Sequence, residues 1–356
     1  MNPKEIDKSE TLKLITVNGE INCNHLDIIS PHEHVLIDIR NQFTEFEEIT
    51  QRKLSEQRIT IENLGVLSRN PYALKDNLVM DDEELAVQEI LHFKKAGGDA
   101  LVDATTIGIG RDPLALKKIS RMTGLAIIAG CGYYTEDTHP EKLRVLSVEK
   151  IAEEMINEIK IGINGTNIRA GVIGEIGTSE PIGETERKIL IASAIAQIET
   201  GLGVLVHTYP WGHTGLEILK IFKKNKATIN KVCICHVDVE IDNEYCEKIM
   251  EAGAFIEFDD FGKEFFIDRR VRGFAGGVFA RDIERVRAIK KFIDKGYVKN
   301  ILISCDVCLK TLLHRYGGWG YDHILNNILT MMSEEGIGKE DINIIIRENP
   351  KRFLCV

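Results

Sequence analysis

The chain has 356 residues, of which 44% are hydrophobic, so it is long enough to bury a large core. Its formal net charge of −10 and isoelectric point near 5.6 argue against binding to nucleic acid or to an anionic membrane surface, because both attract positive charge. No stretch reaches the roughly 18 apolar residues of a membrane span, and residues 1–8 lack the apolar core of a signal peptide. We expect a cytoplasmic protein whose partner is a small molecule.

Short apolar stretches alternate with amphipathic stretches along the chain. Strands are predicted near residues 25–30, 100–104, 125–130, 170–175, 203–207, 231–236, 254–258 and 300–305. Helices are predicted near residues 82–96, 113–123, 147–161, 184–200, 214–225, 242–252, 279–295 and 340–347. Asp112 before Pro113 is typical of a helix start, and Gly201 is typical of a helix end. This alternation favours a (β/α)8 TIM barrel over an open sheet.

Two connections are longer than the others, at residues 41–80 after the first predicted strand and 258–301 after the seventh. We interpret both as insertions within one domain spanning residues 1–356. Long loops at the C-terminal side of barrel strands usually cover a site. The second insertion contains Arg269, Arg270 and Arg272, which are candidates for binding an anionic substituent, although a run of charges in a loop is more often only solvated.

The first predicted strand leads into Pro31-His32-Glu33-His34. In an extended segment residues i and i+2 point the same way, so His32 and His34 can present ring nitrogens to one metal ion while Glu33 points elsewhere. Such a pair alone is weak evidence, because most His-x-His sequences in proteins bind no metal. Further ligands must come from the rest of the chain.

Four other predicted strands end in a side chain that can bind a metal. The apolar runs at 170–174, 203–206, 232–235 and 301–305 are followed by Glu175, His207, His236 and Asp306. Because active sites of (β/α)8 barrels form where the C-terminal ends of the strands meet, these side chains are expected to converge with the two histidines of the first strand.

Six donors exceed the four ligands of one tetrahedral ion, so we predict two divalent ions. Imidazole and carboxylate donors suit zinc, which we expect first, with manganese, iron or cobalt as alternatives. The predicted ligands are His32, His34 and Asp306 for one ion, His207 and His236 for the other, and Glu175 as a bridge between both.

The eight cysteines include Cys233-x-Cys235 and Cys305-x-x-Cys308, which superficially resemble metal or redox pairs. We predict buried free thiols instead, because the first pair lies in an apolar strand and no second Cys-x-x-Cys completes a zinc site. Disulfides are not expected in a reducing compartment.

Seven segments in order along the chain carry a family resemblance: PHEHVLID at 31–38, TIGIGRDP at 106–113, AGVIGEIGTS at 170–179, VHT at 206–208, CHVD at 235–238, SCD at 304–306 and ENPKRF at 348–353. With them the chain resembles the phosphotriesterase family of the amidohydrolase superfamily, and within it the phosphotriesterase-homology branch. The resemblance implies a binuclear hydrolase and, since members are commonly homodimers, a homodimer. Many members bridge their metals with a carboxylated lysine. This chain has no lysine between Thr166 and Thr185. Glu175 lies there instead, and it is similar to the glutamate of the homology branch.

The predicted centre suggests roles for further residues. Two ions would share a water and generate a bridging hydroxide near neutral pH, and Asp306 would be both a ligand and the base that moves the proton to the leaving group. Tyr133 and Tyr134 follow the third predicted strand and are candidates for substrate binding, with Tyr134 preferred. Trp211, Trp319 and Tyr321 are candidates for the pocket wall. To orient ligand imidazoles we expect Asp38, Asp103 or, preferably, Asp238.

Three functions fit these residues. The leading one is hydrolysis of a small lactone or carboxyl ester. An amidase or phosphoesterase would use the same metals, because hydroxide attacks carbonyl and phosphoryl centres alike. A non-catalytic metal-containing binding protein is the alternative of another class, and it is disfavoured because binding alone would not require the base Asp306.

Overall fold

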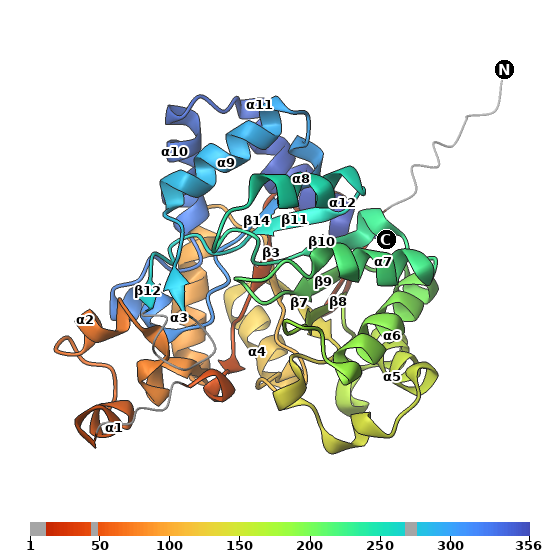
Figure 1. Ribbon diagram of the computed structural model, residues 1–356, viewed down its shortest axis with the longest axis horizontal. Coiled ribbons are helices and arrows are strands. Elements are labelled where there is room, and N and C mark those ends of the chain that lie inside the picture. The colour runs from red at the N-terminus through yellow and green to blue at the C-terminus, as the bar shows by residue number, and fades with distance from the viewer. Residues whose placement is uncertain (1–11, 44–48, 268–275) are drawn as a thin grey trace.

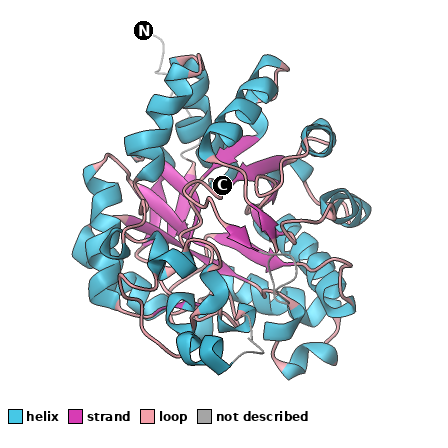
Figure 2. Cartoon of the chain, turned by 60° about the vertical axis from the view of Figure 1, so that its left-hand side comes forward, coloured by secondary structure: helices cyan, strands magenta, loops and turns pink. Residues whose placement is uncertain are grey.

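The computed structural model describes residues 12–43, 49–267 and 276–356. Its eight central strands are parallel and follow one another around a nearly closed barrel in chain order. They are β3 (Ile29–Glu33), β6 (Ala100–Asp103), β7 (Ala126–Cys131), β8 (Val172–Gly177), β9 (Val204–His207), β10 (Val232–Ile234), β11 (Phe255–Phe258) and β14 (Ile301–Ile303). Figure 2 shows these strands enclosed by helices. The predicted (β/α)8 fold is therefore confirmed.

All eight predicted strands are present, but the first lies farther along the chain than expected. The sequence predicted it near 25–30, whereas β3 begins at Ile29. The segment Cys23–His25 forms a 3-10 turn instead, because the side chain of Asn22 accepts a hydrogen bond from the backbone N–H of Asn24. Most of the apolar run at residues 26–29 that indicated a strand therefore lies before β3.

The helices between the strands also agree with the prediction. They are α3 (Glu83–Lys95), α4 (Pro113–Thr123), α5 (Val148–Lys160), α6 (Glu184–Thr200), α7 (Gly215–Lys224), α8 (Asn243–Glu251) and α9 (Asp282–Asp294), coloured in chain order in Figure 1. At the start of α4 the Asp112 carboxylate accepts the N–H groups of Leu114 and Ala115, each at 3.0 Å. None of the helices in the described part of the chain has the length and apolar content to cross a membrane.

The last helical region is longer than predicted. In place of a single helix at 340–347, α11 (Lys339–Asn343) continues through the π-helical stretch Ile344–Glu348 into α12 (Asn349–Leu354). A further helix, α10 (Leu329–Glu334), had no sequence prediction.

Short antiparallel pairs lie outside the barrel and were not predicted. β1 (Lys13–Thr16) pairs with β2 (Gly19–Asn22), and β4 (Ile37–Asp38) pairs with β5 (Val79–Met80) at the base of the first insertion, which also contains α1 (Ile49–Ser55) and α2 (Leu64–Leu67). In the second insertion β12 (Phe266–Ile267) pairs with β13 (Gly277–Val278). The arginines Arg269, Arg270 and Arg272 lie outside the described residues.

The expectation of no disulfide is wrong for one pair. Cys23 and Cys355 are joined by a disulfide, with their Cα atoms 6.5 Å apart. The two residues are 332 positions apart in the sequence, so no spacing rule could pair them. They meet because the backbone of Lys13 exchanges hydrogen bonds with that of Val356 beside them. Cys233, Cys235 and Cys305 are buried free thiols as predicted, and Cys308 is a half-buried one.

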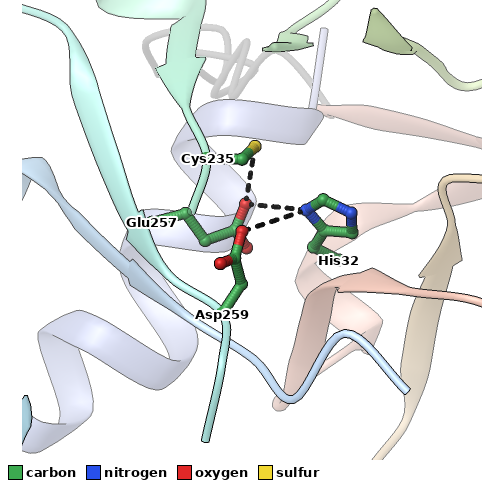
Figure 3. A group of neighbouring side chains, drawn as sticks. All are labelled: His32, Cys235, Glu257 and Asp259. Atoms are coloured by element: carbon green, nitrogen blue, oxygen red, sulfur yellow. Dashed lines mark hydrogen bonds and ion pairs between the residues drawn. The ribbon is translucent and has the colours of Figure 1, made fainter. Parts of the chain in front are cut away.

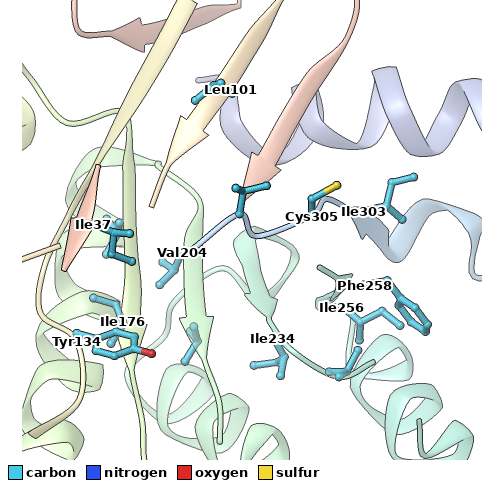
Figure 4. Close-up of a cluster of buried hydrophobic side chains, with 14 of the residues drawn as sticks. Ile37, Leu101, Tyr134, Ile176, Val204, Ile234, Ile256, Phe258, Ile303 and Cys305 are labelled. Atoms are coloured by element: carbon cyan, nitrogen blue, oxygen red, sulfur yellow. The ribbon is translucent and has the colours of Figure 1, made fainter. Parts of the chain in front are cut away.

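Both faces of the barrel strands are covered. Val102, Leu205 and Leu302 belong to one buried apolar cluster, whereas their neighbours Leu101 and Val204 belong to a second cluster together with residues of the helices. Figure 4 shows part of this second cluster. Because successive residues of a strand point to opposite faces, strands that are buried on both sides read as continuous apolar runs, which is how the sequence revealed them.

A buried ion-pair network joins α9 to the C-terminal ends of the strands. The Arg285 guanidinium is fully buried and donates to Asp238 Oδ2 at 2.8 Å, Asp282 Oδ1 at 3.0 Å and the Lys263 carbonyl at 3.2 Å. A buried cation with three partners is expensive to remove, because the carboxylates stay behind without compensation.

We therefore expect Arg285→Met to lower the free energy of unfolding by about 3–5 kcal/mol. Arg287 is the matched control on the same helix: its side chain is 59% exposed and pairs with Glu335, so Arg287→Met should cost at most about 1 kcal/mol. Urea unfolding of both variants measures the difference. Equal losses would show that the network contributes no more than a surface pair.

Candidate metal centre

The six predicted donors meet at the C-terminal ends of the barrel strands. Two come from the end of β3 and the others from β8, β9 and the segments after β10 and β14, and each is at most 5% exposed: His32, His34, Glu175, His207, His236 and Asp306. The structure thus brings together all the side chains that the sequence nominated. That they bind metal stays a prediction.

Two of the donor strands are irregular where the donors leave them. The register of β3 against β6 shifts between Ser30 and Glu33, and the register of β8 against β9 shifts between Ile173 and Ile176. Such shifts re-aim side chains and are frequent beside active sites. They direct His32 and Glu175 toward the same point.

Glu175 lies between the other donors. Its Oε2 atom is 3.2 Å from His207 Nδ1 and 3.5 Å from both His32 Nε2 and His236 Nε2. Its Oε1 atom is 3.3 Å from His34 Nε2. One carboxylate therefore faces all four imidazoles, which is the position expected of a bridging ligand.

Asp306 completes the first group of donors. Its Oδ1 atom lies 3.0 Å from His34 Nε2 and 3.8 Å from His32 Nε2. Its Oδ2 atom faces away from the imidazoles and forms an ion pair with Lys263. On the other side of Glu175, His236 Nε2 is 2.8 Å from His207 Nδ1.

Carboxylates behind the donors orient two of the imidazoles. His32 Nδ1 lies 3.4 Å from both Glu257 Oε2 and Asp259 Oδ2 (Figure 3), and His236 Nδ1 lies 3.0 Å from Asp259 Oδ1. For His236 this contact is a hydrogen bond, and a proton held at Nδ1 leaves the Nε2 lone pair free to face the centre. For His34 the Nδ1 partner is Thr105 Oγ1 at 2.8 Å.

The prediction that Asp238 orients a ligand imidazole is wrong. Its carboxylate accepts the backbone N–H groups of Asp259 and Asp260 at 3.2 and 3.1 Å and touches no imidazole. Asp38 pairs with Arg40, and Asp103 accepts backbone N–H groups of Val35 and Thr105. Asp238 therefore supports the segment that carries the actual partner, Asp259.

Sequence reasoning missed Glu257, Asp259, Asp260 and Lys263. The sequence did contain a signal for two of them: Asp259 and Asp260 directly follow the apolar strand β11, just as the donors follow their strands. Asp260 pairs with Lys263 at 2.9 Å, and all four residues are at most 4% exposed.

Unusual backbone conformations accompany two donors. His236 has φ of 60° and Asp306 has φ of 42°, in the left-handed region that disfavours residues other than glycine. The N–H of His236 is held by both oxygens of Asp259 at 3.1 Å. Glu33 accepts the N–H groups of Cys305 and Val307, on either side of Asp306, at 3.0 and 2.9 Å.

The charges in the site attract cations. Burial acts to lower the pKa of His34, but the neighbouring carboxylates of Asp306 and Glu175 raise that pKa to about 9. Burial acts to raise the pKa of Asp306, yet Lys263 and the neighbouring histidines hold it well below its usual value. The centre therefore carries ionised carboxylates whose negative charge favours any positive group at the imidazole nitrogens.

A cavity opens over the donors. It is lined by donor side chains on one side and by apolar residues on the other, including Ile37, Trp211, Phe265, Phe279 and Leu309. Its volume of about 40 Å³ is more than one ordered water molecule needs. Trp211 thus lies in the pocket wall as predicted, whereas Trp319 and Tyr321 do not line this cavity.

The two tyrosines after β7 face different directions. The Tyr134 hydroxyl lines the cavity, lies 3.3 Å from His207 Nδ1 and accepts a hydrogen bond from Gln42 Nε2 at 3.0 Å. The Tyr133 hydroxyl instead donates to Glu154 at 2.5 Å, away from the donors. Neighbours in an extended segment point to opposite sides, so only one tyrosine can face the cavity. Tyr133 is therefore removed from the candidates for substrate binding.

Two donor atoms show that metal ions fit this site. Within the described residues, His32 Nε2 and Asp306 Oδ1 are buried and have no hydrogen-bond partner, although each points toward other donors. Buried polar atoms are normally satisfied. Nitrogen and carboxylate oxygen atoms of this kind are ligands of zinc and related divalent ions.

The chain is similar to known proteins over nearly its whole length. The model of the phosphotriesterase family matches residues 12–354. The chain is 37% identical over 344 residues to an N-acetyltaurine hydrolase of Danio rerio, covering 96% of this chain and 97% of that protein.

Two solved structures are also similar. The crystal structure of a resiniferatoxin-binding protein from Rhodobacter sphaeroides has a TM-score of 0.92 at 35% identity and covers 96% of this chain and 94% of its own. The phosphotriesterase homology protein from Escherichia coli has a TM-score of 0.76 at 26% identity and covers 92% and 99%. With the family match extending over nearly the whole chain, the protein is a hydrolase that belongs to the phosphotriesterase family.

Proposed function

We propose that this chain is a binuclear metal-dependent hydrolase that cleaves the amide bond of a small N-acyl compound. The observation that carries the proposal is the convergence of four imidazoles and two carboxylates on one buried point, with Glu175 facing every imidazole. The amide was the second expectation from the sequence, after a lactone or ester. It now comes first because N-acetyltaurine, the compound named for the whole-chain relatives, is an acetyl amide.

The arrangement of donors supports two ions rather than one. The donor atoms of His32, His34 and Asp306 lie within 4.8 Å of one another. Glu175 Oε2 lies 3.2 Å from His207 Nδ1 and 3.5 Å from His236 Nε2, and His32, Glu175 and His236 form a second such group. The surrounding carboxylates also outnumber the ammonium groups: besides Glu175 and Asp306, Asp259 and Asp260 are buried here, and the ammonium group of Lys263 pairs with Asp260 and Asp306. Two divalent ions, zinc by our first expectation, would compensate this excess.

The residues of the chain have distinct tasks in this proposal. When bound, the two ions would supply an activated water and polarise the carbonyl group of the substrate. Asp306 lies beside His32 and His34 at the centre and is placed to receive the proton of that water and pass it to the departing amine. Tyr134 directs its hydroxyl into the cavity, where it can donate a hydrogen bond to the carbonyl oxygen as negative charge develops there.

The cavity favours a short acyl group. Its apolar wall and small volume suit a fragment the size of an acetyl group, which has three heavy atoms besides the nitrogen. A larger amine portion would extend toward the mouth of the barrel. The substrate class that follows is an acetylated or similarly short-chain acylated amine.

Metal content and turnover test the proposal together. We expect about two divalent ions per chain in protein purified without added metal, and hydrolysis of N-acetyltaurine or another short N-acyl amine in a panel that also includes lactones, esters and phosphotriesters. Prolonged chelation should abolish turnover and zinc should restore it. Fewer than one ion after metal supplementation, without turnover of any class, would instead support the metal-containing binding protein.

Replacing the proposed base should stop the reaction without emptying the site. We expect Asp306→Asn to lower kcat by about 100-fold or more, because general acid–base catalysis contributes typically 10²–10⁴-fold. Asp99 is the matched control: its carboxylate accepts the N–H groups of Asp27 and Ile28 at the opposite end of the strands. Asp99→Asn should keep full turnover. Unchanged kcat in an Asp306→Asn protein with two bound ions would rule out its role as base.

The two adjacent tyrosines give a matched test of substrate binding. Tyr134→Phe should reduce kcat/KM by about 10- to 100-fold, the value of one hydrogen bond to a developing charge. Tyr133→Phe should leave kcat/KM unchanged, because that hydroxyl bonds to Glu154. Steady-state kinetics on the same acyl compound measures both, and equal effects of the two substitutions would contradict the assignment.

A further inference from the structure

Lys263 is buried beside the centre, in the segment after β11. Among the described lysines it is the only buried one, with 4% of its surface exposed. Its ammonium group forms ion pairs with Asp306 Oδ2 and, at 2.9 Å, with Asp260 Oδ1. Burying a lysine is costly unless its charge is compensated. Lysines usually lie at the surface, so the position of this one between two buried carboxylates indicates a role inside the site.

The two oxygens of Asp306 have different surroundings because of this lysine. Oδ2 is covered by Lys263 Nζ and by Cys308 Sγ at 3.7 Å. Oδ1 has no hydrogen-bond partner among the described residues and lies 3.0 Å from His34 Nε2. One oxygen is thus occupied by the protein, and the other is presented to the donors.

Lys263 is itself held in place. Its backbone N–H donates to the Asp260 carbonyl at 3.0 Å, and its own carbonyl accepts from Arg285 at 3.2 Å. Arg285 is fixed in turn by Asp238 and Asp282. The backbone around Asp306 is fixed independently by Glu33. Both partners of the Lys263–Asp306 pair are therefore anchored, and the carboxylate cannot turn without breaking the pair.

We propose that Lys263 is a positioning residue that limits Asp306 to one ligand oxygen. This inference rests on the proposed metal centre. By covering Oδ2, the lysine prevents the carboxylate from binding an ion with both oxygens, and so keeps one coordination position open for water or substrate. Catalytic sites need such an open position, whereas structural sites are closed by protein ligands.

The test compares cobalt-loaded protein with and without the lysine. Cobalt replaces zinc readily, and its visible absorption is stronger at low coordination number than at five or six. Lys263→Met keeps an unbranched apolar side chain that ends where the ammonium nitrogen would begin, and so removes the charge. We expect this variant to bind as much cobalt per chain as the wild type, with weaker visible absorption. Its kcat for N-acetyltaurine should fall by about 10- to 100-fold, with KM changed much less.

Lys310→Met is the matched control, because Lys310 forms a partly buried ion pair with Asp76 at 2.7 Å and touches no donor. Its absorption and kcat should equal those of the wild type. If Lys263→Met does not fold, Lys263→Gln, which also ends one atom short of the ammonium nitrogen and carries no charge, is measured in the same way. A Lys263 variant with the wild-type spectrum would overturn the inference and leave the metal centre standing. A wild-type protein that binds no cobalt would overturn both.

Discussion

The site depends on buried carboxylates that hold the backbone of the donor segments. Glu33 accepts two N–H groups that flank Asp306, and thereby joins the end of the first barrel strand to the end of the eighth. Asp259 accepts the N–H of His236 in the same way. A carboxylate buried without a cation is costly, and backbone N–H groups are the partners that reduce this cost here. Donor positions are consequently set by main-chain hydrogen bonds as much as by side-chain packing.

A second layer of contacts carries this support outward. Asp238 accepts the N–H groups of Asp259 and Asp260, and Arg285 of α9 binds Asp238. Asp259 in turn orients His32 and His236, one imidazole on each side of Glu175. Both halves of the proposed centre therefore depend on the Asp259 carboxylate and, through Asp238 and Arg285, on helix α9 in the layer around the strands. Positions this far from the donors can influence metal binding without touching an ion.

The sequence predicted the barrel and the donor set because both follow from local rules. Apolar runs indicated strands that are buried on both faces, and the first polar side chain after each run indicated the donors. These local rules failed where the outcome depended on the direction of a side chain or on a contact between residues far apart in the sequence. Asp238 is close to His236 in sequence but points at the backbone, only one of Tyr133 and Tyr134 can face the cavity, and no local signal pairs Cys23 with Cys355. Asp259 was overlooked although it obeys the same strand-end rule.

The left-handed backbone at His236 and Asp306 sets stability against function at these two positions. A non-glycine residue in this conformation costs on the order of 1–3 kcal/mol, which the rest of the fold must offset. Glycine would relieve that cost at either position, and it would also remove a donor atom. Selection for thermal stability alone would therefore replace these donor residues while the barrel fold is kept. A family member with glycine at both positions would be expected to be a stable barrel that has lost the activity.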